Sequence, residues 1–308
     1  MSTERRHYKS FIDDSARWDA LQLRDGDIII ATPSKSGTTW MQMCCALLIF
    51  QTPEPPAPLA VLSPWLDMLT SPIDDIVELL DAQTHRRFIK THTPLDGIPT
   101  DARVTYVCVG RDPRDAALSM EDHMANMDLG KVLVAREHAV GLEDVDPASL
   151  GGPPIEDPVD RFWHWVDSGG GHEERSPGLA SVLEHLQTFW DRRNEPNVAL
   201  FHYADLKADL DGQLRRLAGI LRIEVPEDRW PALVDAATFE RMKAKADLLA
   251  PDTTHGIWVD NAKFFRKGQS GRWRDVVSDE DQPRYDARVA QLVDPELAQW
   301  AHHGWLGT

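Results

Sequence analysis

Short runs of β-branched and aromatic residues recur along the chain, each bounded by polar or turn-forming residues. They lie at 27–32, 87–91, 104–109 and 198–203. Apolar runs of this length without regular polar alternation are typical of strands covered on both faces. The pattern therefore predicts interior strands.

Segments with helical features follow three of these runs. Residues 40–50 form an apolar stretch after two threonines, and residues 114–124 follow a Gly-Arg-Asp-Pro turn. A third helix is expected from about Asp205, with leucines at 206, 210, 214 and 217. Strands that alternate with helices favour a parallel sheet. We predict an α/β fold with a central parallel sheet flanked by helices, in a single domain over residues 1–308.

Residues 130–177 depart from this alternation. They include Gly-Gly-Pro-Pro at 151–154, Gly-Gly-Gly at 169–171 and a short aromatic stretch at 161–165 that is expected to be helical. Long loops within compact domains often cover binding sites. We predict a mobile lid here.

Charge and hydropathy restrict the partners and the location. The net charge is −17, which disfavours binding to nucleic acid or to an anionic membrane surface. The longest apolar run, residues 43–50, is far shorter than the roughly 18 residues of a membrane span. No apolar secretory signal opens the sequence, so we predict a cytoplasmic protein without integral membrane association. Its three cysteines lie in apolar segments and are expected to be buried thiols.

The loop Ser34-Lys35-Ser36-Gly37-Thr38-Thr39 separates the first strand from its helix. A glycine there allows successive N–H groups to face one anion, and the helix N-terminus adds partial positive charge. The loop is therefore a candidate phosphate cradle, although a capped helix beside an exposed lysine is an alternative. It is not a Walker A motif, because Lys35 precedes Gly37.

Two further basic clusters accompany this loop. Arg111 follows the strand at 104–109, and Ser119 lies about two turns into the next helix. Ligands bind at the carboxyl edge of parallel sheets, so both are candidates for a second phosphate. Pairing of Arg111 with Asp112 or Asp115 is the alternative. Residues 266–268, Arg-Lys-Gly, form the other cluster.

Four segments together resemble the cytosolic-type sulfotransferases. They are Lys-Ser-Gly-Thr-Thr-Trp at 35–40, Lys-Thr-His-Thr-Pro at 90–94, Val-Gly-Arg-Asp-Pro-Arg-Asp at 109–115 with Ser119, and Phe-Arg-Lys-Gly at 265–268. Their order and spacing match over nearly the whole chain. The amino-acid sequence of residues 18–27 and 88–97 most resembles that of bacterial glycolipid sulfotransferases.

The resemblance implies a P-loop-like sulfotransferase fold and the donor 3′-phosphoadenosine-5′-phosphosulfate (PAPS), with no metal. It assigns the 5′-phosphosulfate to Lys35, Ser36, Gly37, Thr38 and Thr39. It assigns the 3′-phosphate to Arg111, Ser119, Arg266, Lys267 and Gly268. It assigns the nucleoside to Trp40, Tyr203, Thr238, Phe239 and Phe265. On sequence alone, core packing of Trp40 and Phe239 is the alternative.

The same resemblance implies the catalytic roles. Lys35 is expected to stabilise charge on the bridging oxygen, Lys90 to neutralise the sulfuryl oxygens, and His92 to act as general base. His123 and His164 are further candidates for the acceptor side. At position 272 an arginine stands where the family pattern has an acid, which puts the anchoring of that loop in question.

The acceptor is expected to be a hydroxyl on a hydrophobic or glycolipid carrier. Apolar residues that could line its entrance are Pro64, Trp65, Leu66, Met68, Leu69, Trp163 and Trp165. A phenol, alcohol or sterol acceptor is an alternative within the same fold. A magnesium-dependent small-molecule kinase and a non-catalytic sensor of adenosine 3′,5′-bisphosphate (PAP) are the other functions considered.

Overall fold

The predicted strands form one parallel sheet. The computed structural model describes residues 5–146, 150, 155–168, 178–251, 256–265, 268 and 270–307. In this part of the chain the strands are β1 (Ile28–Ala31), β2 (Phe88–Thr91), β3 (Thr105–Gly110) and β4 (Val198–His202), in the order β2-β1-β3-β4. Ile28 pairs with both Phe88 and Thr105, so β1 lies between β2 and β3.

Both faces of this sheet are buried, as the apolar runs predicted. Along β1, Ile29 and Ala31 belong to one core, whereas Ile28 and Ile30 belong to the other. Successive side chains in a strand point to opposite faces, so each strand supplies both cores. A sheet buried on both sides explains why these strands are apolar without alternation.

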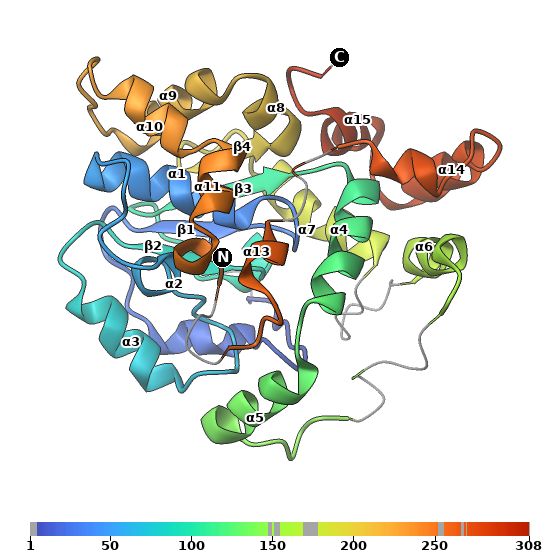
Figure 1. Ribbon diagram of the computed structural model, residues 1–308, viewed down its shortest axis with the longest axis horizontal. Coiled ribbons are helices and arrows are strands. Elements are labelled where there is room, and N and C mark those ends of the chain that lie inside the picture. Colours follow the sequence, from blue (N-terminus) through green and yellow to red (C-terminus); the bar gives the residue numbers. More distant parts are fainter. Residues whose placement is uncertain are drawn as a thin grey trace.

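Helices cover the two faces of the sheet (Figure 1). The α-helices that precede β3 are α1 (Thr38–Phe50), α2 (Leu59–Leu62) and α3 (Ile73–Ala82). Those between β3 and β4 are α4 (Pro113–Ala125), α5 (Leu129–Val140), α6 (Pro158–Asp167) and α7 (Leu179–Trp190). After β4 come α8 (Tyr203–Ala208), α9 (Leu210–Leu221), α10 (Trp230–Ala236), α11 (Phe239–Ala244), α12 (Ala246–Leu249) and α13 (Asn261–Phe264). The last two are α14 (Gln282–Leu292) and α15 (Pro295–His303).

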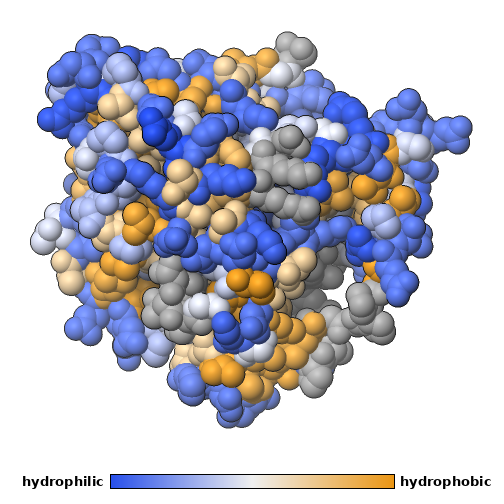
Figure 2. Space-filling view, viewed as in Figure 1, coloured by the Kyte–Doolittle hydropathy of each residue, from blue (hydrophilic) through white to orange (hydrophobic). Residues whose placement is uncertain are grey.

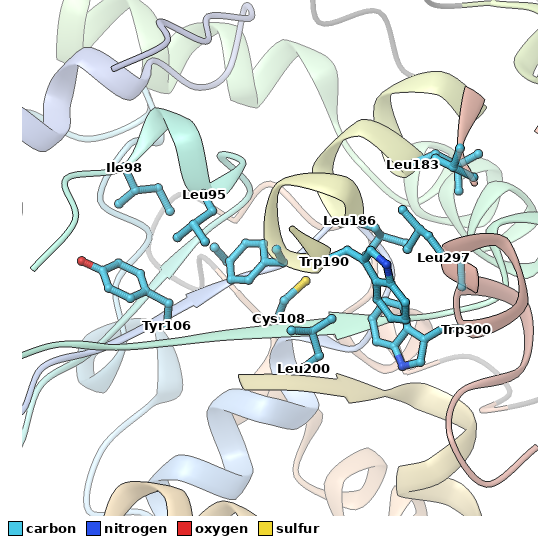
Figure 3. Packing of buried hydrophobic residues seen from close by; sticks show 14 of the residues in the cluster. Leu95, Ile98, Tyr106, Cys108, Leu183, Leu186, Trp190, Leu200, Leu297 and Trp300 are labelled. Carbon is cyan, nitrogen blue, oxygen red and sulfur yellow. The ribbon is translucent and has the colours of Figure 1, made fainter. Parts of the chain in front are cut away.

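The core under α7 and α15 is rich in aromatic side chains. Figure 3 shows Cys108 of β3 and Leu200 of β4 on the sheet, with Leu186 and Trp190 of α7 packed over them. Trp300 of α15 lies beside Trp190, with ring centroids 5.5 Å apart. The opposite core contains α1, α9 and α10, and it encloses Cys44 and Cys45. All three cysteines are buried free thiols, as predicted.

The structure corrects two predicted elements. The helix expected from Asp205 is two helices, because the helical conformation is interrupted at Asp209. The Asp209 side chain accepts a hydrogen bond from the Gly212 amide at 2.9 Å and so caps α9. The segment 130–177 was expected to be loops around one short helix, yet it also contains most of α5. Residues 147–149, 151–154 and 169–177 of the predicted lid lie outside the described residues.

Within the described residues, the structure contains no helix with the length and apolar character needed to cross a bilayer.

Candidate active site

The order of the strands creates a crevice at the carboxyl edge of the sheet. The chain leaves β1 to form β2 on one side and then β3 on the other, and such a switch point is where open α/β sheets bind ligands. The loop after β1 and the turn after β3 meet there, because Arg111 donates through Nη1 to the carbonyl of Lys35 at 2.9 Å.

A single cavity of about 1150 Å³ occupies this edge. Candidate donor-site residues that line it are Lys35, Gly37, Thr38, Thr39, Trp40, Lys90, His92, Arg111, Ser119, Tyr203, Phe239, Phe265 and Gly268. Ser36 and Thr238 are described but do not line it. Arg266 and Lys267 lie outside the described residues. The cavity therefore joins residues from four strand ends and from the C-terminal third of the chain.

The loop between β1 and α1 has the backbone of an anion cradle. Lys35 and Gly37 both have positive φ values, 66° and 110°, so the chain curls tightly before α1. A Cβ on residue 37 would lie 3.2 Å from the Tyr203 ring, so a larger residue would be both strained and crowded. The first amides of α1 have no acceptor within the helix and face outward from its N-terminus. This geometry suits a phosphate or sulfate group.

A buried hydroxyl in the same loop also fits an anionic ligand. The Ser36 side chain is 1% exposed, and its Oγ has no hydrogen-bond partner among the described residues. An unpaired buried hydroxyl normally costs free energy. Thr38, by contrast, hydrogen-bonds through its hydroxyl to Thr32. The residues present therefore fit a bound anion, with the Ser36 hydroxyl as an unpaired donor in the loop, although Ser36 does not itself line the cavity.

Arg111 and its acidic neighbours do not form the ion pair considered from the sequence. Asp112 is instead bound by Arg114, with Nη2 and Oδ2 2.8 Å apart. Asp115 accepts the amide of Gly271 at 2.7 Å. The Arg111 guanidinium lies 4.6 Å from the centroid of the Tyr203 ring, on the cavity wall. Arg111 thus presents positive charge to the cavity.

Lys35 carries an unusual amine. Burial lowers its pKa to about 7, and the positive charges of Arg111 and Lys90 act in the same direction. Its Nζ lies 3.2 Å from Nδ1 of His123 and 4.6 Å from the centroid of the Phe264 ring. Three cations, Lys35, Lys90 and Arg111, therefore share one cavity, which favours a ligand with several negative charges.

The tautomer of His92 follows from its hydrogen bond. Nδ1 lies 2.8 Å from the carbonyl oxygen of Thr32, which can only accept, so Nδ1 carries the proton. Nε2 then has the lone pair that a general base requires. The His92 ring packs edge-on against Trp65 at 4.8 Å, and the Lys90 ammonium lies 4.2 Å from the same indole. Trp65 thus holds both side chains against the cavity.

The part of the cavity expected to take the nucleoside is aromatic. Trp40 donates through Nε1 to the Ala237 carbonyl at 2.8 Å and packs edge-on against Tyr203 at 5.3 Å. A Cβ on residue 268 would lie only 2.8 Å from the Phe239 ring, so Gly268 permits the close approach of these two segments. Trp40 and Phe239 are partly buried against the core and also line the cavity. These two aromatics therefore pack against the core and also present surface to the cavity.

Thr238 occupies a different position from the rest of that group. It precedes α11, and its hydroxyl donates to the Asp235 carbonyl at 2.7 Å. Its side chain therefore serves the turn between α10 and α11.

The opposite part of the cavity is lined mainly by apolar and histidine side chains. They include Phe11, Ile12, Pro64, Trp65, Met68, Met120, Met124, Met127, His164, Trp165, Val182, His185 and Trp258. We call this part the acceptor side. Leu66, Leu69 and Trp163, expected at the entrance, are buried and do not line the cavity. His123 and His164 line it as expected.

Sequence reasoning missed the contribution of residues 8–13, of α7 and of Leu249, Pro251, Ile257 and Trp258 to this wall. None of these segments carries a local motif. Apolar surface also extends outside the cavity, where Val134 and Val140 of α5 are exposed. Figure 2 shows apolar atoms gathered over the lower part of the face on which α5 lies in Figure 1.

The departure at position 272 has a structural explanation. Arg272 donates through Nη1 to Oδ2 of Asp122 on α4 at 2.8 Å. The neighbouring Gly271 amide binds Asp115 on the same helix. The segment after Gly268 is therefore anchored to α4 through an arginine rather than through an acid.

The comparisons with known proteins agree with this architecture. The family model of the sulfotransferase domain matches residues 25–297. The chain belongs to the sulfotransferase family, and it is an enzyme of that class.

Its relatives define the branch of the family. The chain is 46% identical to the glycolipid sulfotransferase of Mycobacterium bovis and 47% identical to that of Mycobacterium tuberculosis. Each match covers 99% of this chain and 96% of the relative. A dog sulfotransferase 1A1 is 27% identical over 89% of this chain and 85% of its own length. The predicted resemblance to bacterial glycolipid sulfotransferases is confirmed.

Solved structures share the fold. A mouse sulfotransferase complexed with PAP aligns with a TM-score of 0.65 and 19% identity, over 94% of each chain. Retinol dehydratase in complex with androsterone and PAP aligns with a TM-score of 0.64 and 22% identity, over 91% of this chain and 84% of that one. The predicted sulfotransferase fold is confirmed.

Proposed function

We propose that this enzyme transfers a sulfuryl group from PAPS to a hydroxyl of a glycolipid. The observation that carries the proposal is the convergence of Lys35, Lys90, His92 and Arg111 on one cavity, from the ends of the three strands β1, β2 and β3. The near full-length identity to glycolipid sulfotransferases supports the acceptor class.

The donor side supplies the groups that a nucleotide with several phosphates requires. The loop from Lys35 to Thr39 would hold the 5′-phosphosulfate, with Ser36 donating its unpaired hydroxyl. Arg111 and Ser119, together with the segment 266–268, would hold the 3′-phosphate. Trp40, Tyr203, Phe239 and Phe265 would enclose the nucleoside, and Thr238 would support α11 beside it.

PAPS, when bound, supplies an activated sulfuryl group and a bisphosphate leaving group. Sulfuryl transfer needs alignment and charge stabilisation more than covalent catalysis, as phosphoryl transfer does. Lys35 stabilises negative charge that develops at the bridging oxygen, and Lys90 neutralises charge on the transferred group. These fixed cations supply the electrostatic stabilisation in this scheme, which uses no metal.

His92 performs the proton transfer. The Thr32 carbonyl keeps the proton on Nδ1, so Nε2 accepts the proton of the acceptor hydroxyl as the oxygen attacks sulfur. Trp65 restricts the ring by its edge-on contact. The resulting imidazolium remains hydrogen-bonded through Nδ1.

The acceptor side is suited to a carrier with an apolar portion. Its methionine side chains adapt to irregular apolar shapes, and its aromatic rings pack against sugar faces or acyl chains. We propose that the segment 130–177 covers this side, since His164 and Trp165 of α6 already line the cavity.

An acceptor panel with labelled PAPS tests the proposal. Glycolipid, sterol, phenol and free sugar are offered separately, and turnover of the glycolipid is expected to exceed that of the others. Preference for the sterol or phenol would show that the proposed acceptor class is wrong, whereas the proposed sulfuryl transfer from PAPS would still hold. Transfer only to free sugars would contradict an apolar carrier. ATP turnover with magnesium and none with PAPS would overturn the reaction itself.

A further inference from the structure

A second histidine lies at the proposed reaction centre. His123 is on the last turn of α4, and its Nδ1 is 3.2 Å from Nζ of Lys35. It is not part of any of the segments that carry the family resemblance. No other side-chain hydrogen bond of Lys35 or His123 is present among the described residues.

The direction of this hydrogen bond fixes the state of the imidazole. The ammonium form of Lys35 can only donate, so while Lys35 is protonated Nδ1 of His123 accepts and the imidazole proton resides on Nε2. Burial, followed by the charges of Lys35 and Lys90, keeps the pKa of His123 well below its usual value. His123 therefore remains a neutral acceptor for Lys35 across the neutral pH range.

The position of His123 is held by the C-terminal segment. Its ring lies 4.6 Å from that of Trp258 and 5.9 Å from that of Phe264, and the Lys35 ammonium packs on Phe264. These two aromatic residues contact each other at 5.4 Å. Lys35 and His123 are thus enclosed by two aromatic side chains that come from beyond residue 250.

The backbone joins α4 to that segment just beyond His123. The side chain of Asn126 donates to the Asp260 carbonyl at 2.9 Å and accepts the Asp260 amide at 3.1 Å. The Val259 amide donates to the Asn126 carbonyl at 2.9 Å, and the Asp128 amide donates to the Ile257 carbonyl at 2.8 Å. The end of α4 therefore has one defined position relative to Trp258 and Phe264.

We propose that His123 is a positioning residue for Lys35. It accepts a hydrogen bond from the Lys35 ammonium through Nδ1. This hydrogen bond fixes where the charge lies in the cavity and raises the pH up to which Lys35 stays protonated. This inference rests on the proposed role of Lys35. The other charged or titratable groups that line the cavity are Tyr8, Lys9, Asp13, Lys90, His92, Arg111, Asp122, Asp146, His164, Glu184, His185, Tyr203, Lys263 and Arg272.

Two variants separate the hydrogen bond from the packing. His123→Phe keeps an aromatic ring and removes the acceptor, whereas His123→Asn keeps an acceptor close to the position of Nδ1. A hydrogen bond to a charged group is typically worth a factor of about ten or more. His123→Phe is expected to lower kcat about tenfold with less than threefold change in the KM for PAPS. His123→Asn is expected to recover most of this loss.

The pH profile gives a readout that packing alone would not change. Loss of the acceptor destabilises the ammonium form of Lys35, so the alkaline limb of kcat should move to lower pH in His123→Phe, by about one unit for a tenfold effect. His123→Asn should return the limb toward its original position. An unmoved limb in His123→Phe would overturn the proposal.

Nuclear magnetic resonance of the donor-free enzyme tests the tautomer without turnover. The ring nitrogens of His123 are expected to show a proton on Nε2 and none on Nδ1 at about pH 6, where Lys35 is protonated. A proton on Nδ1, or titration near the usual histidine pKa, would contradict the proposal.

Lys35→Met distinguishes the two levels of the argument. If Lys35→Met retains full activity, the proposed function of Lys35 is wrong. If Lys35→Met is inactive while His123→Phe behaves as the unmodified enzyme, only the inference about His123 is wrong. In the Lys35→Met background, His123→Phe should cause little further loss, because the two residues act through one hydrogen bond.

Discussion

The two sides of the cavity are built in different ways. The donor side takes its main groups from loops that directly follow the strands, so each group lies within a few residues of a recognisable apolar run. The acceptor side assembles residues 8–13 with side chains from α4, α6 and α7 and with Leu249, Pro251, Ile257 and Trp258. The difference teaches that the candidate anion-binding groups are encoded locally, whereas the shape of the acceptor side depends on distant segments packing together.

The largest expected effect separates chemistry from binding. His92→Ala removes the general base, so kcat should fall by about 10²–10⁴ while the affinity for PAP stays within threefold. Initial rates with labelled PAPS and calorimetric titration with PAP provide the two measurements. His303→Ala, which changes an exposed histidine of α15, is the matched control. Turnover at the original rate in His92→Ala would show that another group is the base.

A donor-side variant should affect nucleotide binding. Arg111→Met removes a cation from the cavity wall, and loss of charge-assisted hydrogen bonds should lower PAP affinity by about 10- to 100-fold. Arg215→Met, on the exposed surface of α9, is the control for loss of one arginine. Equal affinities of the two variants for PAP in calorimetry would show that Arg111 serves the fold rather than the donor.

An acceptor-side variant should have the reverse pattern. Trp165→Ala removes a large aromatic wall from the cavity, so the KM for a glycolipid should rise about tenfold while PAP affinity is unchanged. Trp305→Ala changes an exposed tryptophan outside the cavity and is the matched control. If Trp165→Ala lowers the affinity for PAP by as much as it raises the KM for the glycolipid, the two sides are not separate sites.

The smallest expected effect is the uptake of a fraction of a proton when PAP binds. The pKa of Lys35 is about 7 in the ligand-free cavity, so at pH 8 its amine is mostly neutral. An anionic ligand favours the protonated form, and PAP binding should therefore take up part of a proton at pH 8 and almost none at pH 6. PAP affinity should correspondingly weaken as pH rises above about 7. Calorimetry in buffers of different ionisation enthalpy measures the uptake.

Lys35→Met provides the control for this measurement. It lacks the titrating amine, so any uptake that remains in it must come from another group. Equal uptake in both proteins would remove Lys35 as its source.

Individual residues show which features of the site and the fold could be predicted from the sequence. Lys35, Gly37 and Arg111 were accessible because each follows an apolar strand, and parallel strands end at the same edge. Asp209 was missed as a helix boundary because the leucine spacing continues across it, and the cap depends on its side-chain conformation. Leu66 and Trp163 were misplaced at the entrance because an apolar residue looks the same whether it faces a core or a cavity.

The amino-acid sequence by itself determined the buried parallel sheet, the candidate anion-binding loops and the family, because short-range patterns encode strands, turns and helix starts. Tertiary structure alone decided which side chains meet across the cavity. The pairs Lys35 with His123 and Asp122 with Arg272 join positions 88 and 150 residues apart. Such contacts depend on how α4 packs against the C-terminal segment, and no local pattern in the chain specifies that packing.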